Sequence, residues 1–147
     1  MAINKSNYNE YVKNKTPDSP IIKNCIWAFI VGGLICTLGQ FIRNFLISSG
    51  LGLEESKIVT PIILIFLGGF LTAVGVYDKI GKYAGGGSII PITGFANSIV
   101  SSAMEFKKEG WIMGLGAKMF TVAGPVIVYG TVASVVYGIV YWIATLF

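Results

Sequence analysis

The sequence predicts an all-α integral membrane protein with three transmembrane helices and a central Gly-rich helix that is either re-entrant or interfacial and amphipathic. Apolar side chains make up 54% of the 147 residues and charged side chains only 12%, which is more apolar surface than a soluble domain of this size can bury in one core. Three apolar tracts are long enough to cross a hydrocarbon core of about 30 Å. A segment rich in glycine and small polar residues separates the second tract from the third.

The first 23 residues are polar and basic, and we expect them to form a cytoplasmic tail ahead of a single membrane domain over residues 24–147. The tail lacks the cleavage site of a signal peptide, so the first apolar tract is predicted to remain as an uncleaved span. That span covers about residues 24–47.

The second and third spans are predicted over about residues 58–77 and 121–146. Aromatic residues at the end of the third span are typical of a membrane interface. Gly130, Ser134 and Gly138 recur every four residues on one face of this span. That spacing predicts a helix-packing surface, because small residues let another helix approach closely.

The charges between the spans predict the topology. Lysines precede and follow the central segment, namely Lys79 and Lys82 before it and Lys107, Lys108 and Lys118 after it. The loop between the first two spans instead carries Glu54 and Glu55. Because positive residues stay on the cytoplasmic side, we expect the N-terminus inside and the C-terminus outside.

The central segment, "AGGGSIIPITGFANSIVSSAMEF" over residues 84–106, interrupts the apolar pattern. From Pro91, in the first turn, apolar residues recur with the spacing of an amphipathic helix. The opposite face carries the predicted pore-lining residues Asn97, Ser98, Ser101, Ser102 and Glu105. A surface helix usually carries lysine or arginine on its polar face, and irregular glycine-rich backbone is tolerated at membrane depth only inside protein or beside water. Both points favour re-entry over an interfacial position.

The glycine run before this helix has two interpretations. Gly85, Gly86, Gly87 and Ser88 precede a helix N-terminus, and Lys79 and Lys82 lie just before them. Free N–H groups and the helix dipole favour an anion there, so these six residues are candidate anion contacts. The alternative is a tightly turning loop, for which glycine is equally suited.

The residue inventory argues against catalysis. The chain has no histidine and two cysteines, Cys25 and Cys36, too far apart along one helix for a disulfide. Glu105 and Glu109 flank two lysines and are better explained as a solvated helix end than as an acid–base pair. We therefore expect no enzyme activity, no catalytic residue, no cofactor, no metal site and no nucleic-acid partner.

The stretch "GGGSIIPITGFANSIVSSAMEFKKEG", followed by "GLGAKMF", resembles the signature of the stage V sporulation protein A family of endospore-forming bacteria. The resemblance covers nearly the whole chain, and the polar tail is most similar to that of the AC-type subunits. It implies an oligomeric subunit of the forespore or spore inner membrane that acts with other subunits of the family. It also implies transport of dipicolinic acid with calcium, inward in sporulation and outward in germination, with membrane tension as a candidate gating stimulus.

The sequence therefore supports two hypotheses about function. In the first, residues 84–106 line a channel, and the lysines and glycine run attract the dipicolinate dicarboxylate. In the second, the chain is a non-conducting membrane scaffold that assembles the transport complex through its third span.

Overall fold

The computed structural model describes Tyr8, Val12 and residues 19–146, so most of the predicted N-terminal tail lies outside the described residues. Every regular element in the described part is a helix. Three of these helices, at Ile21–Ser48, Leu53–Ala73 and Trp111–Thr145, are long and apolar enough to cross a membrane. The predicted all-α membrane fold is confirmed.

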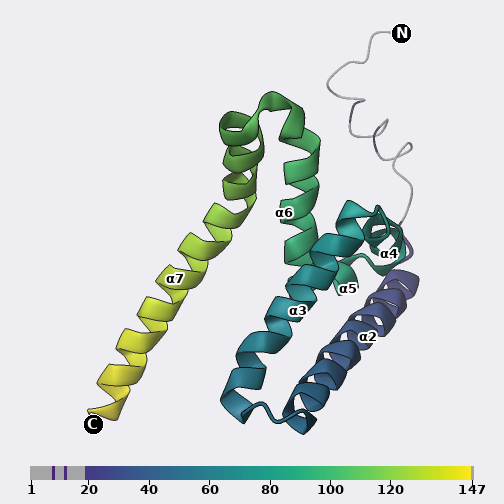
Figure 1. Ribbon diagram of the computed structural model, residues 1–147. Coiled ribbons are helices and arrows are strands. Elements are labelled where there is room, and N and C mark those ends of the chain that lie inside the picture. The colour runs from purple at the N-terminus through teal and green to yellow at the C-terminus, as the bar shows by residue number, and fades with distance from the viewer. Residues whose placement is uncertain (1–7, 9–11, 13–18, 147) are drawn as a thin grey trace.

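Helices α2 (Ile21–Ser48) and α3 (Leu53–Ala73) form an antiparallel hairpin (Figure 1). The backbone N–H of Gly52 donates to the Glu55 carboxylate at 3.2 Å, which satisfies one of the free donors at the start of α3. The negative charge of Glu55 there also complements the helix dipole.

Helix α3 differs from the span predicted over residues 58–77. It begins at Leu53 and ends at Ala73, because Gly75 adopts a positive φ of 72° that a helix cannot continue through. Tyr77 does not end the span but begins the next helix, α4 (Tyr77–Ala84).

After α4 the chain turns inward between α2 and α3 and then returns. Gly85, with φ of 50°, connects α4 to the short α5 (Gly86–Ile89), which packs along α2. The chain then returns through α6 (Ile92–Phe106) to the end of the molecule where α4 lies (Figure 1). The predicted irregular glycine backbone is therefore wrong in detail: residues 84–90 are largely helical, with the break at Gly85.

The contact between α5 and α2 shows how far along α2 the inward-turning segment reaches. Gly87 lies against Ala28 and Gly32, which are roughly 10 and 16 Å along α2 from Ile21 at 1.5 Å per residue. Pro91 then reverses the chain as the N-cap of α6, with an extended ψ of 158°, and not as a residue of its first turn. The segment therefore enters and leaves at the same end of the hairpin.

Helix α7 (Ala117–Thr145) follows the short turns η1 (Lys107–Glu109) and η2 (Trp111–Gly116). It begins at Ala117 and not at Thr121, so Pro125 lies inside the helix. The Lys118 ammonium lies 4.1 Å from the centre of the Phe106 ring and links the start of α7 to the end of α6. Beyond this region α7 diverges from the other helices (Figure 1), and residues 125–146 are exposed.

The two ends of the molecule differ in charge. Helix α4, η1 and the first turn of α7, which carry five lysines, lie at the end where α2 begins (Figure 1). Glu54 and Glu55 lie at the opposite end, as does the C-terminus. This separation agrees with the charge pattern used for the topology, and the orientation in the membrane stays a prediction.

Candidate functional site

A buried polar cluster holds the inward-turning segment together. The Tyr77 side chain, only 4% exposed, has its hydroxyl 2.8 Å from the Ser88 carbonyl oxygen and 2.8 Å from the Thr93 hydroxyl. The Ser88 hydroxyl in turn donates to the carbonyl of Gly85 at 3.0 Å. The cluster joins α4, α5 and α6, and its buried polar groups are mutually satisfied.

The sequence does not single out Tyr77 and Thr93 as structural residues. Tyr77 ends the apolar span predicted over residues 58–77, where a tyrosine is typical of the membrane interface. The available signal was Gly75, since a glycine close to a span end marks a possible helix termination and would have moved Tyr77 into the next element.

Three glycines allow backbones to approach closely around this cluster. A Cβ atom on Gly87 would overlap the Ala28 carbonyl, and one on Gly94 would overlap the Ser88 carbonyl. At Gly68 of α3, an added Cβ would lie 2.8 Å from the Thr93 carbonyl oxygen. No other residue type fits these positions without moving the backbone.

The predicted anion contacts thus occupy different environments. Gly87 and Ser88 are buried in packing contacts, whereas Gly85 and Gly86 are exposed and have open space where a Cβ would point. Lys79 lines a cavity on the α2 side of α4, and Lys82 is exposed in the last turn of α4. The glycine run and these lysines therefore do not form one enclosed site.

Asn97 connects α6 to α3. The Thr72 hydroxyl lies 2.6 Å from the Gly68 carbonyl oxygen and 2.9 Å from the Asn97 side-chain Oδ1. Both oxygens accept from the Thr72 hydroxyl, which has one hydrogen and donates to one of them at a time. Asn97 therefore sits at the edge of the polar face that adjoins α3.

Ser98 lines two cavities at the inner end of α6. One, of about 460 Å³, lies among α4, α5 and α6 and includes Asp78 and Asn97 in its wall. The other, of about 500 Å³, lies between α6 and α7 and includes Phe95 and Val126. The Ser98 hydroxyl donates to the Phe95 carbonyl at 2.8 Å, which leaves its oxygen able to accept a further hydrogen bond.

The other predicted pore-lining residues lie farther along α6. Ser101 and Ser102 are half-buried and Glu105 is exposed, and none of the three lines either cavity. The Ser101 hydroxyl donates to the Ser98 carbonyl at 3.2 Å. The structure thus brings Asn97 and Ser98 together and sets the other three toward the lysine-bearing end.

The predicted packing residues of α7 make no contact with other helices of the described chain. Gly130 and Gly138 are exposed with open space where a Cβ would point, and the Ser134 hydroxyl donates to the Gly130 carbonyl of its own helix at 2.8 Å. Across the residues that the structure describes, no group of three or more histidine, cysteine or acidic residues could hold a metal ion. Cys25 and Cys36 are both free and exposed.

Comparison with known proteins gives two findings. Residues 24–140 match the family described as SpoVAC/SpoVAEB sporulation membrane protein. The chain is also 44% identical to stage V sporulation protein AC of Bacillus subtilis (strain 168) over 137 residues, which cover 92% of this chain and 91% of the relative. No solved structure matches the chain.

Proposed function

The chain belongs to the SpoVAC/SpoVAEB family of sporulation membrane proteins, and from this premise we propose that it is a channel subunit for dipicolinic acid in the forespore and spore inner membrane. The solute is taken up with calcium in sporulation and released in germination. The subunit acts as an oligomer together with other stage V sporulation A subunits. Membrane tension is the proposed gating stimulus.

The return of α6 to the end at which its segment entered carries this proposal. Helix α6, which packs on α3, carries small hydroxyl groups on one side, and such groups are costly in hydrocarbon unless they face water or protein. Ser98, near the middle of α6, lines two cavities. A water-filled path along the serine-bearing side of α6, completed by another subunit, would satisfy these groups.

The charges near this path suit a dicarboxylate accompanied by a cation. The lysines of α4, Lys79 and Lys82, would raise the local concentration of an anion at this end. Asp78, in the wall of the Ser98 cavity, would repel a bare dicarboxylate. A calcium complex would reduce that repulsion. Direct contact of the anion with Gly87 would require its packing against α2 to open, and contact with Ser88 would require the packing of Ser88 against α4 and α6 to open.

Cysteine accessibility tests the path. In a Cys25→Ser, Cys36→Ser background, Ser98→Cys, Ser101→Cys and Ser102→Cys should react with a membrane-impermeant thiol reagent in vesicles, and dipicolinate should slow the reaction. Ala96→Cys and Val100→Cys are the matched controls, because Ala96 is buried and Val100 packs on Gly69 of α3. Uniform protection, or labelling indifferent to dipicolinate, would contradict pore lining.

A non-conducting scaffold is the second candidate, and the open space beside Gly130 and Gly138 favours it. A scaffold would use this face of α7 to bind other subunits. Gly130→Leu should then abolish assembly while Ser98→Leu is tolerated. The purified protein alone in liposomes separates the candidates, because a scaffold gives no conductance.

A further inference from the structure

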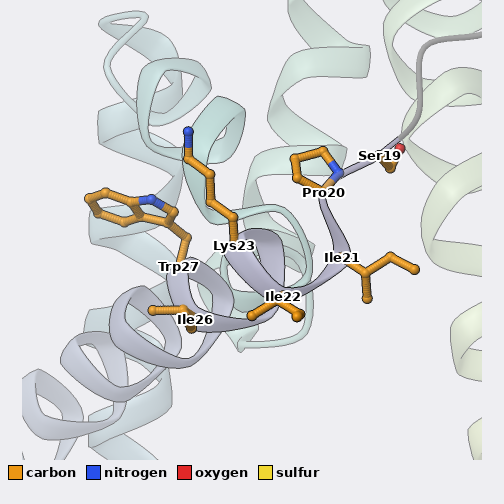
Figure 2. A pocket seen from close by; sticks show the side chains of 7 residues that line it. All are labelled: Ser19, Pro20, Ile21, Ile22, Lys23, Ile26 and Trp27. Atoms are coloured by element: carbon orange, nitrogen blue, oxygen red, sulfur yellow. The ribbon is translucent and has the colours of Figure 1, made fainter.

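Three neighbouring cavities follow one another along α2 and share lining residues. The inner cavity, of about 590 Å³, is lined by apolar side chains of α2 and α3 together with Tyr77, Ile80 and Thr93. The middle cavity, of about 420 Å³ between α2 and α4, shares Val31 and Ile80 with the inner one. The outer cavity, of about 670 Å³ at the start of α2, shares Trp27 with the middle one (Figure 2). We call the three together the α2 groove.

The chemistry of the α2 groove changes along its length. The inner part is almost purely apolar, with leucine and isoleucine side chains from both spans of the hairpin. The outer parts carry two cations, since Lys23 lines the outer cavity and Lys79 the middle one. Figure 2 shows Lys23 and Trp27, one turn apart, projecting from the same side of α2.

Two aromatic rings and two lysines mark the mouth of the α2 groove. Trp27 and Tyr83 have ring centres 6.4 Å apart, and such residues favour the headgroup level of a bilayer. Within the part of the chain that the structure describes, the one ion pair joins Lys57 to Glu54. The charges of Lys23 and Lys79 therefore have no carboxylate partner there and are available to an anion.

We propose that the α2 groove binds one anionic phospholipid, with an acyl chain along the inner part and its phosphate beside Lys23 and Lys79. An apolar groove between two membrane-crossing helices stays free of water, so the surrounding hydrocarbon fills it. Lysines where such a groove meets the cytoplasmic interface select lipids of negative charge. The apolar length and the charged mouth thus match the two ends of one molecule.

This inference concerns lipid binding and does not rest on solute transport, so either can fail without the other. The test uses the full chain with Trp111→Phe and Trp142→Phe, which leaves Trp27 as the single tryptophan. The protein is reconstituted in phosphatidylcholine vesicles that contain a small fraction of acyl-brominated phosphatidylglycerol or acyl-brominated phosphatidylcholine. Bromine quenches tryptophan fluorescence at contact, so quenching reports which lipid occupies the groove.

The brominated phosphatidylglycerol should quench Trp27 at a mole fraction at least about fivefold lower than the mole fraction of brominated phosphatidylcholine that gives the same quenching. A factor of about five corresponds to the attraction between one lysine and an anionic lipid surface. Lys23→Gln with Lys79→Gln should remove this preference. Lys107→Gln with Lys108→Gln is the matched control, because it removes the same charge from η1 at the same end, and it should keep the preference.

Three results would overturn the proposal. Equal quenching by the two lipids in the otherwise unchanged protein would mean that the mouth selects no headgroup. A preference that survives loss of Lys23 and Lys79 would place the headgroup elsewhere. An equal loss in the control variant would mean that overall surface charge, and not the groove, attracts the lipid. Val31→Phe checks the acyl part independently, since a ring in the groove should reduce quenching by both lipids.

Discussion

The phenolic oxygen of Tyr77 lies 2.8 Å from the hydroxyl oxygen of Thr93, across a sequence separation of 16 residues. Tyr77 is the first residue of α4 and Thr93 lies in the first turn of α6. The contact therefore joins the start of α4 to the start of α6. It holds α4, α5 and α6 together as one packed unit.

Tyr77→Phe should lower the free energy of unfolding by about 1–3 kcal/mol, because it leaves the Ser88 carbonyl and the Thr93 hydroxyl buried without this partner. Thermal unfolding in detergent, followed by circular dichroism, measures the change. Tyr83→Phe is the control, since Tyr83 is 65% exposed and its hydroxyl can bond to water. Equal effects of the two substitutions would contradict the role given to the cluster.

Gly87→Ala should destabilise the protein by about 1–3 kcal/mol or more, the cost of forcing extra volume into a packed contact. The added methyl group would overlap the backbone of Ala28 and push α5 away from α2. Gly86→Ala adds the same group into open space one residue earlier and should be neutral or slightly stabilising. The same unfolding measurement compares the two, and a neutral Gly87→Ala would mean that α5 does not pack closely on α2.

Thr72 and Asn97 should be energetically coupled across α3 and α6. A double-mutant cycle with Thr72→Val and Asn97→Leu should give a coupling of about 0.6–1.7 kcal/mol, as for other hydrogen bonds between membrane helices. Thr131→Val replaces Thr72→Val in the control cycle, because the Thr131 hydroxyl bonds only to its own helix, at the Ile127 carbonyl. A coupling near zero in the first cycle would show that Asn97 does not bind Thr72.

Ser98→Leu should reduce dipicolinate release several-fold without removing the protein from the membrane, because a larger, apolar side chain would project into the space that Ser98 lines and remove its hydroxyl group. Thr131→Leu is the control and should leave release unchanged, because it also replaces a hydroxyl with an apolar side chain, on an exposed position of α7 beside the predicted packing face. Release of dipicolinate from spores or loaded liposomes measures the effect, with membrane content checked by immunoblot. Unchanged release in Ser98→Leu would count heavily against the channel and in favour of the scaffold.

Much of the fold could be predicted from the sequence because each membrane helix satisfies its own backbone hydrogen bonds. The length and hydropathy of a tract then decide whether it spans the membrane, whatever other helices pack beside it. The amphipathic spacing after Pro91 likewise predicted α6, which runs from Ile92 to Phe106. The motif around the triple glycine also carried the family resemblance, which the comparisons confirm.

The partners of individual residues could not be predicted in this way. The sequence predicts Asn97 as one of several residues on a polar face. In the structure its side chain contacts Thr72, because Asn97 lies on the side of α6 that faces α3. Gly85, Gly86 and Gly87 are three consecutive glycines that the sequence does not distinguish. Only Gly87 faces the backbone of α2. Local pattern cannot separate them, because the difference comes from an element more than fifty residues away in the chain.

By itself, the sequence determined the all-helical membrane class, the three apolar helices and the family. The tertiary structure decided that the central segment packs on α2 through α5 and returns along α3 as α6, that Tyr77 and Thr93 hold it there, and that the α2 groove joins apolar walls to Lys23 and Lys79. The physical reason is that hydropathy and helix formation act residue by residue along the chain. Close backbone contacts, shared hydrogen bonds and cavities exist only where distant segments meet.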